Sequence, residues 1–314
     1  MPRLSVIIPA FNASSFISQA IESVLTQTYT DYELIVVDDG STDDTASLVM
    51  RYGERLQYVY QKNQGLSSAR NTGIAKAGGE LLAFLDADDY WGREKLEHQV
   101  TLLDSSAETG VVYTALKVVD SDGREIGERG CLRRGYLFSS LLTKNYVTPS
   151  SAIVRRECLE KAGTFDENLS ASEDWDLWLR IAPFYPFDFV DLPLTFYRIH
   201  EGSMHKDLDR MERNVFQVLD KLFKREALNQ EVVQRRCEVL ARHSLDFALN
   251  YFIERNCRNA RRCILSAWRW DKRRVDLFSL TMLFKTLLGK KVINYVSEKR
   301  RGLKTGVKGP RVKG

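Results

Sequence analysis

The chain has 314 residues, 44% of them hydrophobic and 28% charged, which is typical of a soluble globular protein. No window of about 18 uninterrupted apolar residues predicts a membrane-spanning helix, and the short apolar run at the N-terminus lacks the pattern of a secretory signal. The net charge of +4 is divided unequally along the chain. Residues 1–200 carry 19 basic and 29 acidic side chains, whereas residues 201–314 carry 27 basic and 13 acidic side chains. This asymmetry indicates two functional parts, one of which meets an anionic surface or partner.

The first hundred residues alternate short apolar runs with amphipathic segments. Four runs have the length and composition of β-strands: 4–9, 33–39, 56–60 and 80–86. The first two and the last are almost continuously apolar, as in strands buried on both faces of a parallel sheet. Helical patterns lie between them, at 16–25, 42–52 and 65–77, and either Asn12 or Ser14 is positioned to cap the first. This alternation predicts an α/β fold with an open, mainly parallel sheet flanked by helices.

The pattern becomes mixed after residue 110 and almost wholly helical after residue 205. Between these points we expect strands at 111–120, 150–156 and 193–200, and helices at 135–143 and 173–181. The chain is therefore divided into an α/β region 1–205, with halves 1–105 and 106–205, a basic helical region 206–298, and a disordered basic tail 299–314.

Polar clusters follow three of the predicted strands. They lie at 9–12, 38–41 and 86–89, the last within the motif FLDADDYW. A single D-x-D is often no more than a solvated turn. Because the carboxyl ends of parallel strands share the edge of the sheet where ligands bind, the three clusters together predict one acidic pocket. Carboxylates packed this closely repel one another, and a hard divalent cation would relieve the repulsion.

Five motifs occur in a fixed order: SVIIPAFN, VVDDGSTDDT, NQGLSSARNTGIAKAGGE, FLDADDYW and SEDWDLWLR. Over residues 3–200 this set resembles the family 2 glycosyltransferases of the GT-A fold. The resemblance implies a Rossmann-like GT-A sheet and the inverting, metal-dependent transfer of a sugar from a nucleotide diphosphate donor, usually UDP-linked. It also implies a glycan or lipid-linked acceptor in cell-surface polysaccharide biosynthesis.

The D-A-D unit is suited to a metal ion. Alternate residues of an extended segment point the same way, so Asp86 and Asp88 can face one Mn²⁺ or Mg²⁺ ion, and both ions accept oxygen ligands. The resemblance makes Asp88 the direct ligand and shares Asp86 between the metal and the ribose. It makes Asp89 a supporting or turn residue, and it offers His200 for metal or phosphate contact, although a lone histidine is more often structural or exposed.

The resemblance also assigns residues to the nucleotide. It places four side chains around the base, ribose and phosphates: Pro9, Phe11, Asp39 and Arg198. Of these, Asp39 would accept the uracil N–H. Arg70 would contact the nucleotide or its phosphates. The alternative interpretation is that Arg70 lies on the surface and pairs with Glu80 or Asp88.

Glycosyl transfer also needs a base, because an acceptor hydroxyl is a poor nucleophile until a carboxylate takes its proton. The motif SEDWDLWLR offers Glu173 and Asp174 at the start of a helix, where the helix dipole alone also favours acids. The resemblance assigns the base to Asp174, opposite the leaving phosphate, and places Glu173 and Trp175 on the acceptor side. Trp175 and Trp178 would form an aromatic wall for a sugar or would simply belong to the core.

The helical segment 255–301 combines Arg- and Lys-rich stretches with Trp, Phe and Leu residues. This composition favours helices that lie on an anionic membrane surface, and the alternative is a subdomain that packs on the α/β region. The five cysteines are odd in number and lack CxxC spacing, which fits a reducing cytoplasm. We therefore expect a cytoplasmic protein, peripheral on the inner face of the cell membrane. Nucleic acid is not expected as a partner, because no recognition motif accompanies the basic charge.

Other functions are weighed against the transferase. A nucleotidyltransferase would need a Gly-rich basic loop after the first strand, where PAFNASSF stands, and a dehydrogenase would need GxGxxG there. A non-catalytic nucleotide-sugar-binding or scaffold protein would not require Asp39, Asp86, Asp88 and Asp174 together.

Overall fold

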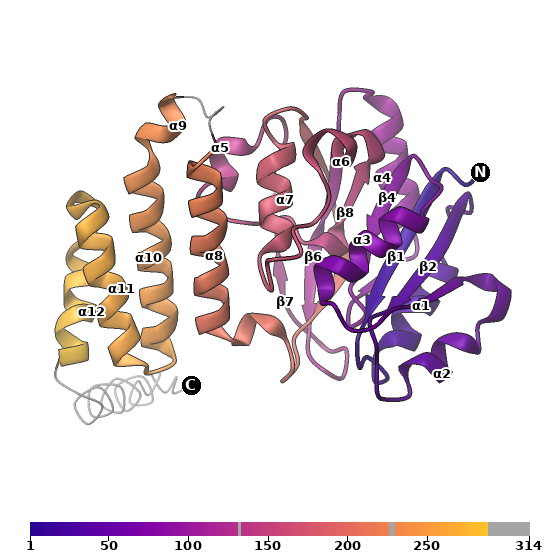
Figure 1. Ribbon diagram of the computed structural model, residues 1–314, viewed down its shortest axis with the longest axis horizontal. Coiled ribbons are helices and arrows are strands. Elements are labelled where there is room, and N and C mark those ends of the chain that lie inside the picture. Colours follow the sequence, from indigo (N-terminus) through magenta and orange to yellow (C-terminus); the bar gives the residue numbers. More distant parts are fainter. Residues whose placement is uncertain (131–132, 226–229, 288–314) are drawn as a thin grey trace, which may run out of the picture. The chain divides into compact units, whose positions relative to one another are not determined.

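The computed structural model describes residues 1–130, 133–225 and 230–287 (Figure 1). The chain forms two compact units, Met1–Val218 and Leu219–Gly314, and the division falls inside helix α8 (Leu208–Phe223). The expected disordered tail at 299–314 and the end of the basic helical region at 288–298 lie outside the described residues.

Four parallel strands form the first half of the sheet in the order β3-β2-β1-β4. They are β1 (Leu4–Ala10), β2 (Tyr32–Asp38), β3 (Gln57–Tyr60) and β4 (Leu81–Phe84). The helices α1 (Ile17–Leu25), α2 (Thr45–Met50) and α3 (Leu66–Lys76) alternate with them along the chain. Every residue of β1 and β4 is buried, as the continuous apolar runs predict. The expected βαβ arrangement is confirmed.

Alternate residues of β1 face opposite layers of helices. One set belongs to a core shared with α1 and α4 (Lys95–Ser105): Leu4, Val6 and Ile8. Ile7 meets α3 instead, and a Cβ atom at Gly73 would come within 2.3 Å of its Cγ2 atom. Only glycine allows this close approach, which holds α3, and with it Arg70, tightly against the sheet.

The second half of the sheet mixes parallel and antiparallel pairs and continues the order as β8-β6-β9-β5, with β7 beside β6. Its strands are β5 (Tyr90–Trp91), β6 (Val111–Val119), β7 (Glu125–Arg129), β8 (Ala152–Arg155) and β9 (Phe187–Arg198). Strand β8 is antiparallel to β4 and β6, whereas β6 and β9 run parallel. The helices α5 (Phe138–Leu141), α6 (Arg156–Ala162) and α7 (Glu173–Ile181) complete the unit. The expected α/β class is confirmed, and α7 has the predicted bounds.

The predicted cap of α1 is wrong. The residue before the helix is Phe16, which makes no capping side-chain hydrogen bond. Asn12 has a left-handed backbone with φ of 48°, and its side-chain oxygen accepts a hydrogen bond from Thr42 N at 2.8 Å. Ser14 N donates to Asp43 Oδ2 at 3.0 Å. The polar residues after β1 therefore hold the loop after β2, which joins the ends of two neighbouring strands.

The second unit is helical, as expected. It contains α9 (Gln230–Gln234), α10 (Arg236–Ile253), α11 (Cys257–Trp270) and α12 (Leu277–Leu287). Helices α10 and α11 bury apolar side chains that include Val239, Phe247, Ala260 and Ile264. In the part of the chain that the structure describes, no helix combines the length and the apolar content needed to cross a membrane.

Candidate active site

The three predicted polar clusters, which follow β1, β2 and β4, lie at one edge of the parallel half-sheet, and two of them supply acids. Asp39 comes directly after β2, and Asp86 and Asp88 come shortly after β4, while both strands run parallel to β1 between them. The carboxyl ends of these strands, and the loops that follow, therefore share one edge. This is the edge where open α/β sheets bind ligands.

Arg70 is buried between two carboxylates. Only 1% of its surface is exposed, its Nη1 donates to Glu173 Oε1 at 2.5 Å, and its Nη2 donates to Asp86 Oδ1 at 2.6 Å. Burial alone would lower the pKa of Arg70, but the charges of Asp86 and Glu173 more than offset this and raise it. The alternative of a surface arginine is wrong, because Arg70 joins α3 to the loop after β4 and to α7.

Asp88 faces His200 on the open side of the same loop. The Nε2 atom of His200 lies 3.0 Å from Asp88 Oδ2, and the two side chains are 22% and 33% exposed. Burial, and then the charge of Asp86, raise the pKa of Asp88. Together with the two carboxylates that share Arg70, Asp88 leaves this edge with surplus negative charge, which favours a bound cation.

The donor set fits a divalent cation that binds together with a phosphate. Among the described residues, no group of three or more His, Cys, Asp or Glu side chains is arranged to hold a metal ion by itself. Asp86 has one oxygen engaged by Arg70, so Asp86 and Asp88 offer a partial oxygen set with His200 beside it. Mg²⁺ commonly binds through one or two protein carboxylates and completes its coordination with phosphate oxygens and water. Mn²⁺ takes the same kinds of ligand.

Arg198 lies behind this loop. Its side chain is only 3% exposed, and its backbone N–H donates to Asp89 Oδ1 at 2.8 Å. Its guanidinium donates to four acceptors: the carbonyl oxygens of Asp88, Asp120 and Ser121, and Gln19 Oε1. In this structure Arg198 fixes the backbone of the Asp86–Asp89 loop, and its contact with a phosphate stays a prediction.

Asp89 supports the loop from inside. It is 2% exposed, and burial, followed by the charge of Asp88, raises its pKa well above the ordinary value. Asp86 and Asp88 are partly exposed instead, so the burial of Asp89 agrees with the supporting role that the resemblance gave it. Its neighbour Tyr90 pairs with Phe196 of β9, which turns Asp89 toward Arg198.

Asp174 stands in the first turn of α7. Its Oδ2 atom accepts a hydrogen bond from Asn145 Nδ2 at 2.8 Å, and its Oδ1 accepts one from the backbone N–H of Trp175 at 2.7 Å. Burial, and then the neighbouring charge of Glu173, raise the pKa of Asp174 to about 7. A carboxylate that titrates near neutral pH is suited to take up and release a proton. Asn145 was not among the expected site residues, because it lies in a loop without a motif.

The acceptor-side residues lie deeper than expected. Trp175 is 2% exposed and its indole N–H donates to Leu141 O at 2.8 Å, so it belongs to the core rather than to the wall of an acceptor site. Trp178 is likewise buried and donates to Val147 O. Glu173 is held by Arg70 and is not exposed, so it acts on the site through that ion pair.

The nucleotide-side residues are divided between the surface and the interior. Phe11 is half exposed just after β1, whereas Pro9 is buried within that strand. Asp39 is buried, and it accepts hydrogen bonds from three donors of one loop: Gln61 Nε2, Gln64 N and Gly65 N. Asp39 therefore shapes the segment that leads into α3, a role that no motif indicated.

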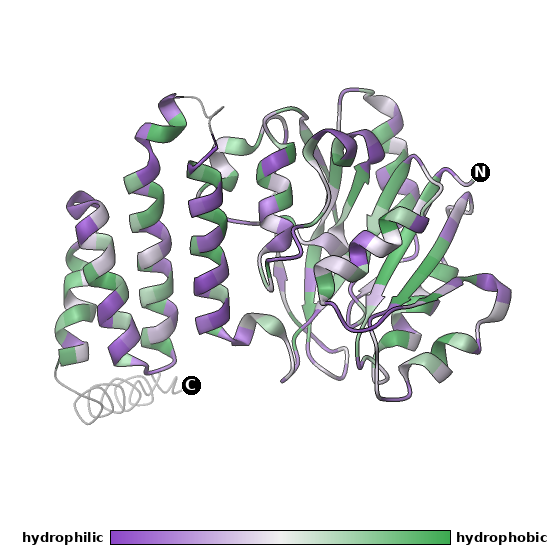
Figure 2. Cartoon of the chain, viewed as in Figure 1, coloured by the Kyte–Doolittle hydropathy of each residue, from purple (hydrophilic) through white to green (hydrophobic). Residues whose placement is uncertain are grey.

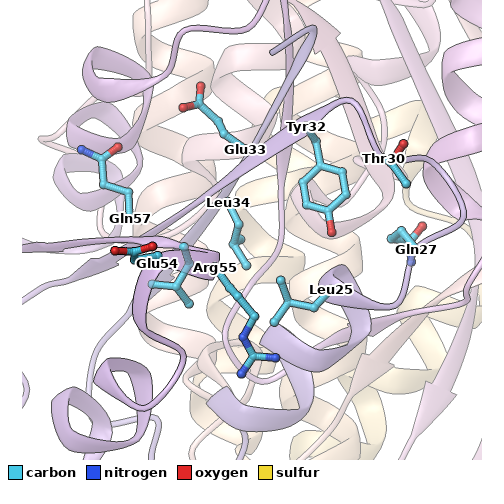
Figure 3. A pocket seen from close by; sticks show the side chains of 10 residues that line it. Leu25, Gln27, Thr30, Tyr32, Glu33, Leu34, Glu54, Arg55 and Gln57 are labelled. Atoms are coloured by element: carbon cyan, nitrogen blue, oxygen red, sulfur yellow. The ribbon is translucent and has the colours of Figure 1, made fainter. Parts of the chain in front are cut away.

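A separate pocket of about 440 Å³ opens at the opposite edge of the sheet (Figure 3). Its lining includes Tyr32 and Glu33 at the start of β2 and Gln57 at the start of β3. None of the expected site residues lines it. The acidic edge and this pocket are therefore different places on the first unit.

Sequence comparison identifies the family. The sequence model of glycosyl transferase family 2 matches residues 5–163, which is half of the chain. An uncharacterized glycosyltransferase of Rickettsia typhi is 30% identical over 242 residues, which are 74% of this chain and 74% of the relative. The chain belongs to glycosyl transferase family 2. The matched part contains Asp39, Arg70, Asp86 and Asp88, whereas Asp174 and His200 lie beyond it.

Other family 2 relatives are longer than this chain. An uncharacterized glycosyltransferase of Rickettsia felis is 30% identical over 74% of this chain, which spans 40% of the relative. The chondroitin synthase of Escherichia coli is 29% identical over 72% of this chain, which spans 33% of that enzyme. The chain thus covers less than half of each of these two proteins.

Solved structures share the GT-A fold of this family 2 chain. TarS of Staphylococcus aureus, residues 1–349, in complex with UDP-GlcNAc, has a TM-score of 0.66 at 21% identity, with 90% of this chain and 89% of that 1–349 fragment covered. The mannosyltransferase PcManGT of Pyrobaculum calidifontis, in complex with GDP-Man and Mn²⁺, has a TM-score of 0.61 at 21% identity, with 94% and 83% covered. These likenesses extend the α/β assignment to the GT-A fold.

Proposed function

We propose that the protein is an inverting, metal-dependent glycosyltransferase that moves a sugar from a nucleotide diphosphate, with UDP-sugars as the first candidates, to an acceptor hydroxyl. The observation that carries this proposal is the position of Arg70 between Asp86 and Glu173. One side of its guanidinium meets the acid beside Asp88, and the other side meets the acid next to Asp174. The diphosphate side and the base side of the reaction are thus linked through one buried cation.

Asp174 is the proposed base. Near neutral pH it is partly ionised, and its ionised oxygen takes the proton of the acceptor hydroxyl as that oxygen attacks the anomeric carbon. The Asn145 amide and the Trp175 N–H hold the carboxylate in one orientation. An inverting displacement requires the base and the leaving group on opposite faces of the sugar, and the ion pairs of Arg70 with Asp86 on one side and with Glu173, next to Asp174, on the other support this assignment.

Asp86, Asp88 and His200 are the proposed ligands on the diphosphate side. A divalent cation held there would neutralise the charge that accumulates on the departing nucleoside diphosphate. Arg198 and Asp89 keep the backbone of this loop in place, and Arg70 orients Asp86. Asp39, Phe11 and Pro9 are the proposed residues around the base and ribose.

Named relatives support the choice of substrates. TarS is described in complex with UDP-GlcNAc and PcManGT with GDP-Man and Mn²⁺. Chondroitin synthase and a putative teichuronic acid biosynthesis glycosyltransferase of Bacillus subtilis are among the relatives. We therefore propose a glycan or lipid-linked acceptor in cell-surface polysaccharide synthesis. Cys158, Cys237 and Cys257 form no disulfide with any described residue, which supports the proposed cytoplasmic location.

Thermal stability measured with added ligands tests the proposal. A ligand that binds only the folded state raises the melting temperature, so UDP with Mn²⁺ should stabilise the protein more than UDP, Mn²⁺ or NAD⁺ added alone. A screen of UDP- and GDP-sugars for donor hydrolysis then identifies the sugar. Equal stabilisation by UDP with and without metal, or no stabilisation by any nucleotide, would contradict the proposal.

A further inference from the structure

Helix α12 is inverted compared with an ordinary surface helix. Its side facing the rest of the helical unit carries Ser279, Met282 and Thr286, which are all buried. Its large apolar side chains are exposed instead: Leu277 is 80% exposed, and Phe284 and Leu287 are each 61% exposed. In Figure 2 much of α12 has the colour of hydrophobic residues. A helix in a soluble protein normally has its apolar stripe toward the core.

The exposed side chains form one stripe. They follow one another at intervals of three, four and three residues: Leu277, Leu280, Phe284 and Leu287. This spacing keeps them on one face of a helix, opposite the buried face. Helix α10 of the same unit provides the contrast, because its exposed positions include Arg242, Asp246 and Asn250. Exposed apolar side chains also occur on α10 (Ile253) and α11 (Leu265), but only α12 among the described helices of this unit combines such a stripe with a buried face that carries Ser279 and Thr286.

Basic side chains accompany the stripe. Residues 257–287 contain eight Lys or Arg and two Asp, and no Glu. Arg273 pairs with Asp271 and Arg274 with Glu238, whereas Arg258, Arg269 and Lys272 form no ion pair with any described residue. The end of α11 adds two half-exposed indoles, Trp268 and Trp270. Positive charge, tryptophan and an apolar stripe therefore occur together on two consecutive helices.

We propose that α12, with the C-terminal part of α11, docks on an anionic lipid surface. The apolar stripe would enter the boundary between headgroups and acyl chains, and the unpaired cations would face the anionic headgroups. A second copy of the chain is a poorer occupant, because a symmetric interface would bring the same excess of positive charge face to face. This inference is independent of the proposed glycosyl transfer, since none of its residues belongs to the acidic edge.

Flotation of the full-length protein with lipid vesicles tests the proposal. Vesicles of phosphatidylcholine with phosphatidylglycerol should carry the protein to the top of the gradient, and vesicles of phosphatidylcholine alone should carry much less. Raising the salt concentration should reduce binding. The double variant Leu277→Ser/Phe284→Ser should bind at least about tenfold more weakly, because burying each large apolar side chain contributes more than that factor in free energy.

The matched control is Met50→Ser/Ile126→Ser, which removes two exposed apolar side chains from the first unit. It should float like the wild type.

A charge variant, Arg269→Gln/Lys272→Gln, changes only exposed side chains, so it keeps the fold and should weaken binding to anionic vesicles. Equal flotation of the wild type and the two α11–α12 variants would overturn the proposal. So would a wild type that does not float but forms a dimer that Leu277→Ser/Phe284→Ser dissociates in light scattering. Stabilisation by UDP with Mn²⁺ should be the same in all variants, which separates this test from that of the proposed function.

Discussion

The two units depart from the usual distribution of side chains in opposite ways. The first unit buries charges, since Arg70, Asp89, Glu173 and Arg198 are each at most 5% exposed. The second unit exposes large apolar side chains along α12. Each departure costs free energy, because buried charges lose hydration and exposed apolar groups order water. Such exceptions are more informative than ordinary burial, and here they are the observations on which the proposed active site and the proposed docking surface rest.

The largest expected effect comes from Asp174→Asn. The amide cannot take a proton, so the transfer rate should fall about 10²- to 10⁴-fold. The donor should bind as before, because Asp174 lies on the base side of Arg70 and the diphosphate ligands lie on the other. Transfer kinetics together with calorimetric donor binding separate the two effects. A variant that transfers sugar at the wild-type rate would show that the base is another group.

Arg70→Met should cause the next largest effect. It leaves the buried Glu173 and the partly exposed Asp86 without their cation, and breaking a buried pair by removing one partner costs about 3–5 kcal/mol. Chemical denaturation measures this loss in the free energy of unfolding. Arg70→Lys is the matched control, because it keeps the charge but cannot donate to both acids in the same geometry. A loss below about 1 kcal/mol for Arg70→Met, in the range of surface ion pairs, would mean that the pair is not buried in solution.

The pH profile should follow Asp174. Because burial and Glu173 raise its pKa from 3.8 to about 7, the ionised base is lost as the pH falls below 7. We expect kcat/KM to decline about tenfold per pH unit there. The free energy of unfolding changes in the opposite direction. Between pH 3.8 and about 7, Asp174 is protonated in the folded protein but ionised in the unfolded chain. Its contribution to the free energy of unfolding therefore decreases as the pH rises through this range. A flat rate profile between pH 5 and 8 would contradict the assigned role.

The sequence predicted the elements better than the contacts. Continuous apolar runs defined β1, β2 and β4, and the acidic first turn located α7, because these signals depend on local spacing. The motifs predicted that Asp86 and Asp88 lie at the edge of the sheet where the parallel strands end, and the structure has them there with Arg70 in contact. The partners of Arg70 could not be derived, because Glu173 is more than one hundred residues away and any of several acids would have served. The burial of Trp175 and the inversion of α12 depend on neighbouring helices, which periodicity alone does not specify.

The smallest effect on activity should come from Trp175→Phe. As a core residue, Trp175 contributes packing and a hydrogen bond to Leu141 O, so its loss should destabilise the fold by about 1–3 kcal/mol. The KM for the acceptor should not change. Phe11→Ala is the contrasting variant, since this exposed aromatic should affect the donor KM and leave the melting temperature nearly constant. A raised acceptor KM in Trp175→Phe would restore the aromatic-wall interpretation.

The central claim is that the acidic edge of the sheet binds a nucleoside diphosphate together with a divalent cation. Calorimetric titration of UDP in the presence of Mn²⁺, performed on Asp88→Asn, tests it most directly. The account predicts at least about tenfold weaker binding than in the wild type and no further effect of Mn²⁺, whereas Asp122→Asn on an exposed turn should bind normally. If Asp88→Asn binds UDP with wild-type affinity and wild-type dependence on Mn²⁺, the proposed site is contradicted.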